Sequence, residues 1–220
     1  MRNTCFLQCA KGTLRREHPL NVEKYRLNSF SNTDGLLRER GFDLLQEYLR
    51  IITEGQLVPG PIVELATGTG RTSAILARQG YEVITGDITP EKRADALRRI
   101  SPAYGKQVSM MVFNMEKLPF RSRSIRTMIS LNTIHELDHP GKCLSELVRV
   151  HDPDGILVVG DFNDTGFEVM DEVHKIVFGK PHSRGRLSMD SVRKELTDLY
   201  ESVFTIETPL NISVVCRGKV

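Results

Sequence analysis

The chain has 220 residues, which fits one large α/β domain or two small ones. Hydrophobic residues make up 40%, enough for a sizeable buried core, and charged residues make up 26%, an ordinary share for a soluble surface. The formal net charge of +2 gives no electrostatic reason to expect nucleic acid as a partner. No stretch approaches the roughly 18 apolar residues that a membrane span needs, so we expect no membrane-embedded part.

The N-terminal stretch carries no targeting signal that we recognise. Its apolar run, Cys5-Phe6-Leu7, is too short for the apolar region of a secretory signal. Cys5 and Cys9 have no second cysteine or histidine pair at zinc spacing nearby, which favours free thiols over a metal site. We therefore expect a cytoplasmic protein with reduced cysteines and no bound metal.

Apolar residues at helical spacing predict a first helix over residues 36–52, with Asp34 as its cap and Gly55 at its end. After it, short strands alternate with helices. The expected strands are 62–65, 81–84, 108–113, 127–131, 156–160, 202–208 and 212–217. The expected helices are 72–79, 90–100, 139–150, 165–177 and 189–200.

This alternation predicts a doubly wound α/β fold with a parallel sheet, formed by residues 35–220 as a single domain. Residues 152–155, Asp-Pro-Asp-Gly, predict a turn before the fifth strand. The last two strands have no helix between them, so they should be antiparallel neighbours. A parallel sheet that ends in an antiparallel hairpin argues against a flavodoxin-like domain.

In a doubly wound sheet, ligands bind beyond the carboxyl ends of the strands. The first strand ends at Glu64-Leu65 and runs into Ala66-Thr67-Gly68-Thr69-Gly70. Glycines here permit a sharp turn, and they let backbone N–H groups approach a ligand closely. The dinucleotide pattern G-x-G-x-x-G would place Ala66, Gly68 and Arg71 at the glycine positions, which disfavours a nicotinamide cofactor.

The spacing from Glu64 to Gly70 resembles motif I of the class I S-adenosylmethionine-dependent methyltransferases, acid-x-Gly-x-Gly-x-Gly, with Ala66 in place of the first glycine. That change is mild if the φ angle of Ala66 is negative. The run Asn114-Met115-Glu116-Lys117-Leu118-Pro119-Phe120 looks like the family's Asp-Ala-x-x-Leu-Pro-Phe segment. Residues 128–150 are similar to the fourth strand and following helix of the ubiquinone/menaquinone-type small-molecule methyltransferases. The resemblance implies a Rossmann-like, seven-stranded sheet with a terminal antiparallel hairpin.

The resemblance also implies a binding site for S-adenosylmethionine. Asp87 would bind the ribose hydroxyls, Ile88 would pack on the adenine, and Asn114 would meet the adenine amino group. Met115 would pack against the adenine ring, although a role as an ordinary residue of the hydrophobic core is an equally good interpretation. The methionine part of the donor would lie at the end of the fourth strand. The cofactor-binding residues implied are Glu64, Ala66, Thr67, Gly68, Gly70, Asp87, Ile88, Asn114, Met115 and Asn132.

Displacement from an activated sulfonium needs an aligned acceptor and, where the acceptor carries a proton, a base. The catalytic candidates are Asp161 and His135. We favour Asp161 slightly because it follows the fifth strand and faces the expected acceptor pocket, whereas His135 also fits a structural role. His174 and His182 lie near one another in sequence and could form a metal- or acid-binding pair.

The function expected is direct in-line methyl transfer to a small molecule or a protein side chain. The N-terminal arm, residues 1–34 with Tyr25 and Phe30, is expected to fold over the donor as part of a lid. Asn132-Thr133-Ile134-His135 replaces the Asn-Pro-Pro-Tyr of enzymes that methylate amino groups of adenine or glutamine, which argues against that class. A non-catalytic S-adenosylmethionine-binding module and a nicotinamide-dependent oxidoreductase remain as alternatives.

Overall fold

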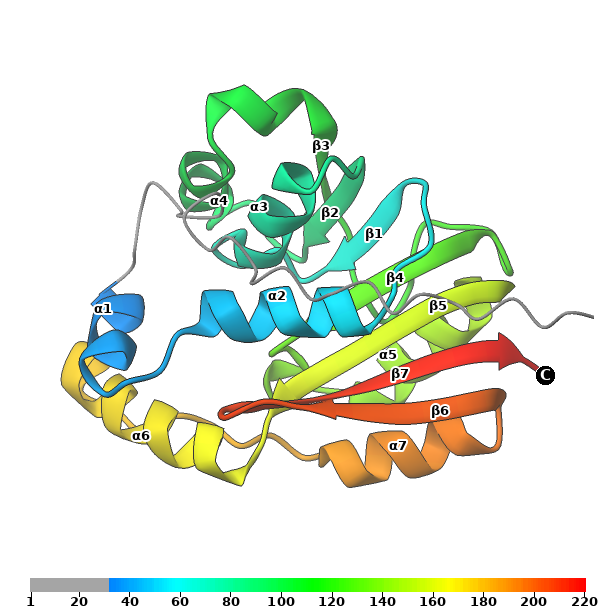
Figure 1. Cartoon of the computed structure of the whole chain (residues 1–220). Coiled ribbons are helices and arrows are strands. Elements are labelled where there is room, and N and C mark those ends of the chain that lie inside the picture. Colours follow the sequence, from blue (N-terminus) through cyan, green and yellow to red (C-terminus); the bar gives the residue numbers. More distant parts are fainter. Residues whose placement is uncertain (1–31) are drawn as a thin grey trace, which may run out of the picture.

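Segments rich in β-branched residues alternate with segments of helical periodicity along the chain. The computed structural model describes residues 32–220 and shows how these elements assemble (Figure 1). One seven-stranded sheet has the order β3-β2-β1-β4-β5-β7-β6. The strands are β1 (Ile62–Leu65), β2 (Val83–Asp87), β3 (Val108–Val112), β4 (Ile125–Leu131), β5 (His151–Phe162), β6 (Tyr200–Glu207) and β7 (Asn211–Lys219). Strands β1 to β5 pair in parallel, and β7 is antiparallel to both β5 and β6.

The helices cover both faces of the sheet. They are α1 (Asn32–Glu39), α2 (Leu44–Glu54), α3 (Arg71–Arg78), α4 (Arg93–Ile100), α5 (Pro140–Val150), α6 (Asp164–Phe178) and α7 (Met189–Thr197), with the 3-10 turns η2 (Pro102–Gln107) and η3 (Ile134–Glu136). Side chains of β5 alternate between two cores: Val158 packs with α2 and α3, whereas Leu157 packs with α5 and α7. In Figure 1, α2 crosses in front of β4 and β5 while α5 lies behind them.

The helix expected over 36–52 is two helices, so that prediction is wrong in one respect. The chain breaks between α1 and α2 near Gly41, whose φ is +83°. Asp43 caps α2, because its side chain accepts a hydrogen bond of 2.9 Å from the Leu45 amide. Asp34, expected as the cap, lies inside α1. Gly55 ends the second helix as expected.

Asp34 instead forms a buried ion-pair network that joins α1 to α3 and α4. Its carboxylate lies 2.5 Å from Arg71 Nη2 and 3.0 Å from Arg99 Nη2. The Arg71 guanidinium also lies 5.5 Å from the centre of the Tyr48 ring. The bulky side chain that argued against a dinucleotide loop therefore turns toward the N-terminal helices.

The turn expected at 152–155 is also wrong, because β5 runs without interruption from His151 to Phe162. The Asp154 amide donates to Asp152 Oδ1 at 2.9 Å, and the pairing of β5 with β4 shifts register between Ile125 and Thr127. The turn-forming residues are thus absorbed as an irregularity within the strand.

The terminal hairpin is confirmed, and α2 fastens it to the rest of the domain. Glu47 Oε2 accepts hydrogen bonds from Thr208 Oγ1 at 2.5 Å, the Leu210 amide at 2.9 Å and Asn211 Nδ2 at 2.6 Å. All four residues are buried. A buried carboxylate with three donors holds the β6–β7 turn against the first core.

Most of the predicted N-terminal arm, including Cys5, Cys9, Tyr25 and Phe30, lies outside the described residues. Cys143 and Cys216, in the described part, are buried free thiols. Across residues 32–220, no helix combines the length and apolarity required to cross a membrane.

Candidate functional site

The loop between β1 and α3 adopts left-handed backbone conformations at three alternate residues. The φ angles are +61° at Ala66, +49° at Gly68 and +75° at Gly70. A Cβ added to Gly70 would lie 2.9 Å from Ala96 Cβ, so glycine is needed there both for φ and for the close approach of α4. Ala66 does not meet the condition under which its methyl group would be mild, because its φ is positive. The surrounding structure therefore keeps Ala66 in a strained backbone conformation.

Glu64 lies beneath this loop and anchors it. The residue is 2% exposed, and its carboxylate accepts hydrogen bonds from Ser73 Oγ on α3 and, at 2.6 Å, from Thr85 Oγ1 on β2. Thr85 also pairs with Thr67 Oγ1 at 2.6 Å. Burial raises the pKa of Glu64 to about 7, although the Ser73 and Thr85 hydroxyls act in the opposite direction. The carboxylate thus fixes the loop to both neighbouring elements.

Asp87 ends β2 and turns its carboxylate toward the loop. Oδ2 accepts a hydrogen bond of 3.0 Å from the Gly68 amide, and Oδ1 accepts one of 2.9 Å from the Ile88 amide. An ionised carboxylate offers about four acceptor positions, so about two remain for a ligand. Adjacent hydroxyl groups of a ribose would match that pair.

A cavity of about 210 Å³ opens beside this carboxylate. Five of the ten predicted cofactor-binding residues line it: Ala66, Asp87, Ile88, Asn114 and Met115. Ile88 is 63% exposed, which leaves a branched apolar side chain available to cover a flat ring. Met115 both lines the cavity and belongs to the core cluster of α5, so the two interpretations of it are compatible.

Asn114 and Asn132 place amide groups at two strand ends. Asn114 Oδ1 accepts a hydrogen bond of 2.8 Å from the Glu116 amide, and no described contact occupies its Nδ2. Asn132 follows β4 with a φ of +53°, and both of its side-chain polar atoms are buried without a partner among the described residues. An unpaired buried amide costs roughly 1–3 kcal/mol, so the site fits a ligand that supplies a polar partner there.

The two predicted catalytic residues lie in direct contact. His135 Nδ1 lies 2.6 Å from Asp161 Oδ1, and the His135 amide donates to Asp161 Oδ2 at 2.8 Å. Asp161 Oδ1 also accepts from the Phe162 amide at 2.8 Å. Both residues are at most 5% exposed. Because an ionised Asp161 only accepts, it selects the tautomer with the proton on Nδ1 and leaves His135 Nε2 as an acceptor.

His174 and His182 pack against this pair. The ring centres of His135 and His182 are 4.7 Å apart, and those of His174 and His182 are 4.2 Å apart. Burial, followed by the His135 and His174 charges, lowers the pKa of His182 to about 4. Near neutral pH this histidine therefore acts as an uncharged ring. No group of three or more His, Cys, Asp or Glu side chains within residues 32–220 is arranged to hold a metal ion.

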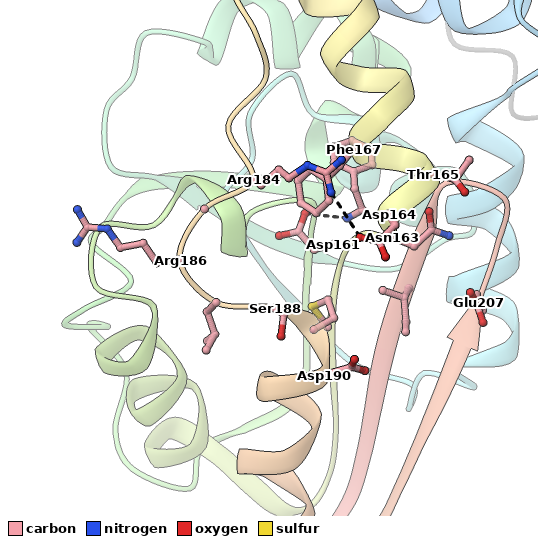
Figure 2. A pocket seen from close by; sticks show the side chains of 15 residues that line it. Asp161, Asn163, Asp164, Thr165, Phe167, Arg184, Arg186, Ser188, Asp190 and Glu207 are labelled. Atoms are coloured by element: carbon pink, nitrogen blue, oxygen red, sulfur yellow. Dashed lines mark hydrogen bonds and ion pairs between the residues drawn. The ribbon is translucent and has the colours of Figure 1, made fainter.

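A second cavity, of about 540 Å³, is lined by Asp161 and shares no lining residue with the first (Figure 2). Its walls are the end of β5, the start of α6, residues 184–190 and the facing ends of β6 and β7. A Cβ on Gly185 would lie 2.4 Å from His135 Cα, so the 184–190 segment rests directly on the His135 backbone. Sequence reasoning did not single out this segment, since it carries no motif.

Comparisons with known proteins agree with this geometry. Residues 63–159 match the family described as Methyltransferase domain. The demethylmenaquinone methyltransferase of Thermus thermophilus is 33% identical over 139 residues, which is 62% of this chain and 58% of that protein. Its counterpart in Clavibacter sepedonicus is 31% identical over 102 residues, 46% of this chain and 41% of that protein. The chain spans about half the length of the curated relatives it matches.

Solved structures share the fold. A SAM-dependent methyltransferase from Aquifex aeolicus has a TM-score of 0.61 at 19% identity, covering 86% of this chain and 98% of that one. A glycopeptide N-methyltransferase complexed with S-adenosylmethionine has a TM-score of 0.61 at 17% identity, covering 79% of this chain and 93% of that one. The doubly wound sheet that the sequence predicts is confirmed, and the solved structures share it.

Within the region that matches the methyltransferase family, the predicted cofactor-binding residues lie in different surroundings. Glu64 is enclosed beneath the loop, while Thr67 and Gly68 line a small cavity of about 10 Å³ on the other side of Asp87. Sequence reasoning missed Thr133 and Glu136, which line the 210 Å³ cavity from the η3 turn. Their position directly after β4 was the available signal, because strand ends meet at one edge of the sheet.

Proposed function

We propose that this chain is an S-adenosylmethionine-dependent methyltransferase that transfers the methyl group directly to a small molecule or a protein side chain. The observation that carries the proposal is the lining of the 210 Å³ cavity, where Asp87 offers a carboxylate with acceptor positions to spare and Ile88 an exposed apolar side chain. Asn132, which precedes the lining residue Thr133 in the chain, adds an unpaired buried amide. Together they match a ribose, an adenine and an amino-acid end.

Each residue of the donor site would bind a different part of S-adenosylmethionine. Asp87 binds the ribose hydroxyls, and Ile88 with Met115 encloses the adenine ring. Asn114 keeps an N–H donor for a ring nitrogen, and its oxygen can accept a second bond from the adenine amino group. Asn132 pairs with the amino or carboxylate group of the methionine part. Glu64 contributes by holding the loop in position.

Alignment supplies most of the rate enhancement in such a reaction. The donor provides a methyl group already activated on a sulfonium. Holding an acceptor in line with it can be worth about 7–11 kcal/mol. Where the acceptor carries a proton, His135 Nε2 is the base, because Asp161 accepts three hydrogen bonds and acts as its positioning partner. This reverses the slight preference for Asp161 that the sequence suggested.

The relatives inform the choice of acceptor. The curated relatives from Thermus thermophilus and Clavibacter sepedonicus are named demethylmenaquinone methyltransferases, which favours a small molecule over a protein side chain. A cytoplasmic location, the absence of a nucleic-acid partner and the lid role of residues 1–34 stay predictions from the sequence.

Calorimetric titration with S-adenosylmethionine tests the donor site. Asp87→Ala and Asp87→Asn should weaken binding roughly 10- to 100-fold, because hydrogen bonds to a charged acceptor contribute about 1.5–3 kcal/mol. Asp198→Ala, which removes an exposed carboxylate just after α7, should bind like the wild type. Equal affinity in wild type and both Asp87 variants would refute the ribose assignment.

A further inference from the structure

His135 lies in the wall between the two cavities and lines neither of them. Thr133 and Glu136, its neighbours along the chain, line the 210 Å³ cavity. Asp161 and Gly185, which contact His135, line the 540 Å³ cavity. The His135 side chain is only 3% exposed. The proposed base is therefore closed off from both cavities in this conformation.

Residues 180–188, here called the cover segment, complete this wall. The segment connects α6 to α7 and contains no helix or strand. Its His182 ring packs against three aromatic rings, with ring centres 4.7 Å from His135, 5.7 Å from Phe162 and 6.1 Å from Phe167. Its Gly185 lies directly on the His135 backbone. The ring and the glycine together keep His135 from solvent.

The polar contacts of the cover segment with the rest of the domain are weak. They are a bond of 3.0 Å from the His182 amide to Asp171 Oδ1, an ion pair of 3.4 Å between Arg184 and Asp164 (Figure 2), and a bond of 3.4 Å from Arg186 to the carbonyl oxygen of Asp138. Both arginine side chains are exposed, and their contacts are near the upper limit for a hydrogen bond. These two contacts therefore contribute little to holding the segment in place.

The closed position also has a cost at His182. Its Nδ1 is buried without a hydrogen-bond partner in the part of the chain that the structure describes. In water this nitrogen would regain a partner, which offsets part of the packing lost when the ring is withdrawn. Gly179 and Gly185 have φ angles of +69° and +71°, and glycine moves readily between positive and negative φ. The segment can therefore turn at these two residues.

We infer that the cover segment is a gate that turns at Gly179 and Gly185, withdraws the His182 ring and uncovers His135 in the wall between the cavities. Its bearing on methyl transfer rests on the proposed function, since His135 can take a proton from an acceptor only in the open state. The opening itself requires neither donor nor acceptor, so it can be measured on the protein alone.

Diethyl pyrocarbonate acylates uncharged imidazole nitrogens that solvent reaches, so it measures how often His135 is uncovered. Peptide mass spectrometry compares its rate of modification with that of the exposed His139 in the same sample. In the wild type we expect His135 to react at least tenfold more slowly than His139. Gly185→Ala places a methyl group against the His135 backbone, which displaces the gate, and should raise the His135 rate about tenfold.

Gly80→Ala is the matched control. Gly80 also has a positive φ, +92°, but a methyl group there would meet nothing within 4 Å, and the residue lies after α3, outside the cover segment. Its His135 rate should equal that of the wild type. If Gly185→Ala does not fold, Arg184→Ala with Arg186→Ala removes two contacts of the segment and should raise the rate about threefold.

Three results would overturn the gate: a wild-type His135 that reacts as fast as His139, no acceleration in the Gly185 variant or its substitute, or equal acceleration in Gly80→Ala. Donor binding is measured separately by calorimetry. A gate that fails while S-adenosylmethionine binds leaves the proposed function standing, whereas absent donor binding removes the proposed function and leaves the opening to be judged on the His135 rates.

Discussion

Exchange of Glu64 for glutamine is expected to change how the stability of the protein depends on pH. Burial raises the pKa of this carboxyl from 4.5 to about 7 in the folded state. Below pH 4.5 the group is protonated in both states. Between 4.5 and 7 only the unfolded chain releases its proton, so the free energy of unfolding falls by about 1.4 kcal/mol per pH unit. Over this range the loss is about 3 kcal/mol, and above it the loss is complete.

Glu64→Gln keeps an oxygen to accept from Ser73 or Thr85 and carries no charge at any pH. Relative to wild type, the variant should therefore gain about 3 kcal/mol between pH 4.5 and 8, whatever its stability at the acidic end. Urea unfolding of both proteins at intervals of one pH unit measures this difference. Glu195→Gln, on the exposed side of α7, is the control and should show no such trend. A difference between Glu64→Gln and wild type that stays constant over this range would refute the reasoning.

Three further exchanges have expected outcomes that follow from single contacts. Ala66→Gly relieves a φ of +61° and should raise the free energy of unfolding by about 1 kcal/mol in denaturant titration; a decrease would contradict the strain. Glu47→Ala leaves three donors of the β6–β7 turn without their acceptor and should lower the free energy of unfolding by about 3 kcal/mol. An unchanged denaturant midpoint would show that the turn is stable without Glu47. In Asp161→Asn, ¹⁵N spectra should show His135 losing its single Nδ1–H tautomer; a spectrum like that of wild type would remove the positioning role.

The sheet could be predicted because most of its strands are short and apolar, and because helices follow β1, β2, β4 and β5 along the chain. The positions of Asp87 and Asn114 followed from the same rule, since parallel strands end at one edge. Local periodicity also has limits. Apolar residues continue at helical spacing on both sides of Gly41, so the spacing of apolar residues does not reveal the break between α1 and α2. At 152–155, pairing with β4 overrides the local preference for a turn.

Long-range contacts determine the rest of the site. Asp34 meets Arg71 and Arg99 across 37 and 65 residues, and no spacing rule connects them. The Asp161–His135 contact likewise depends on how the β4 and β5 ends meet, which explains why the two were weighed as separate candidates. The positive φ of Ala66 appears only when the loop is closed between β1 and α3.

A crystal structure of the protein bound to S-adenosylhomocysteine tests the central claim most directly. The account predicts both ribose hydroxyl oxygens within hydrogen-bond distance of the Asp87 carboxylate, the adenine between Ile88 and Met115, and a polar partner for the Asn132 amide. A ligand bound elsewhere, or one that leaves Asp87 and Asn132 without contact to it, would contradict the account.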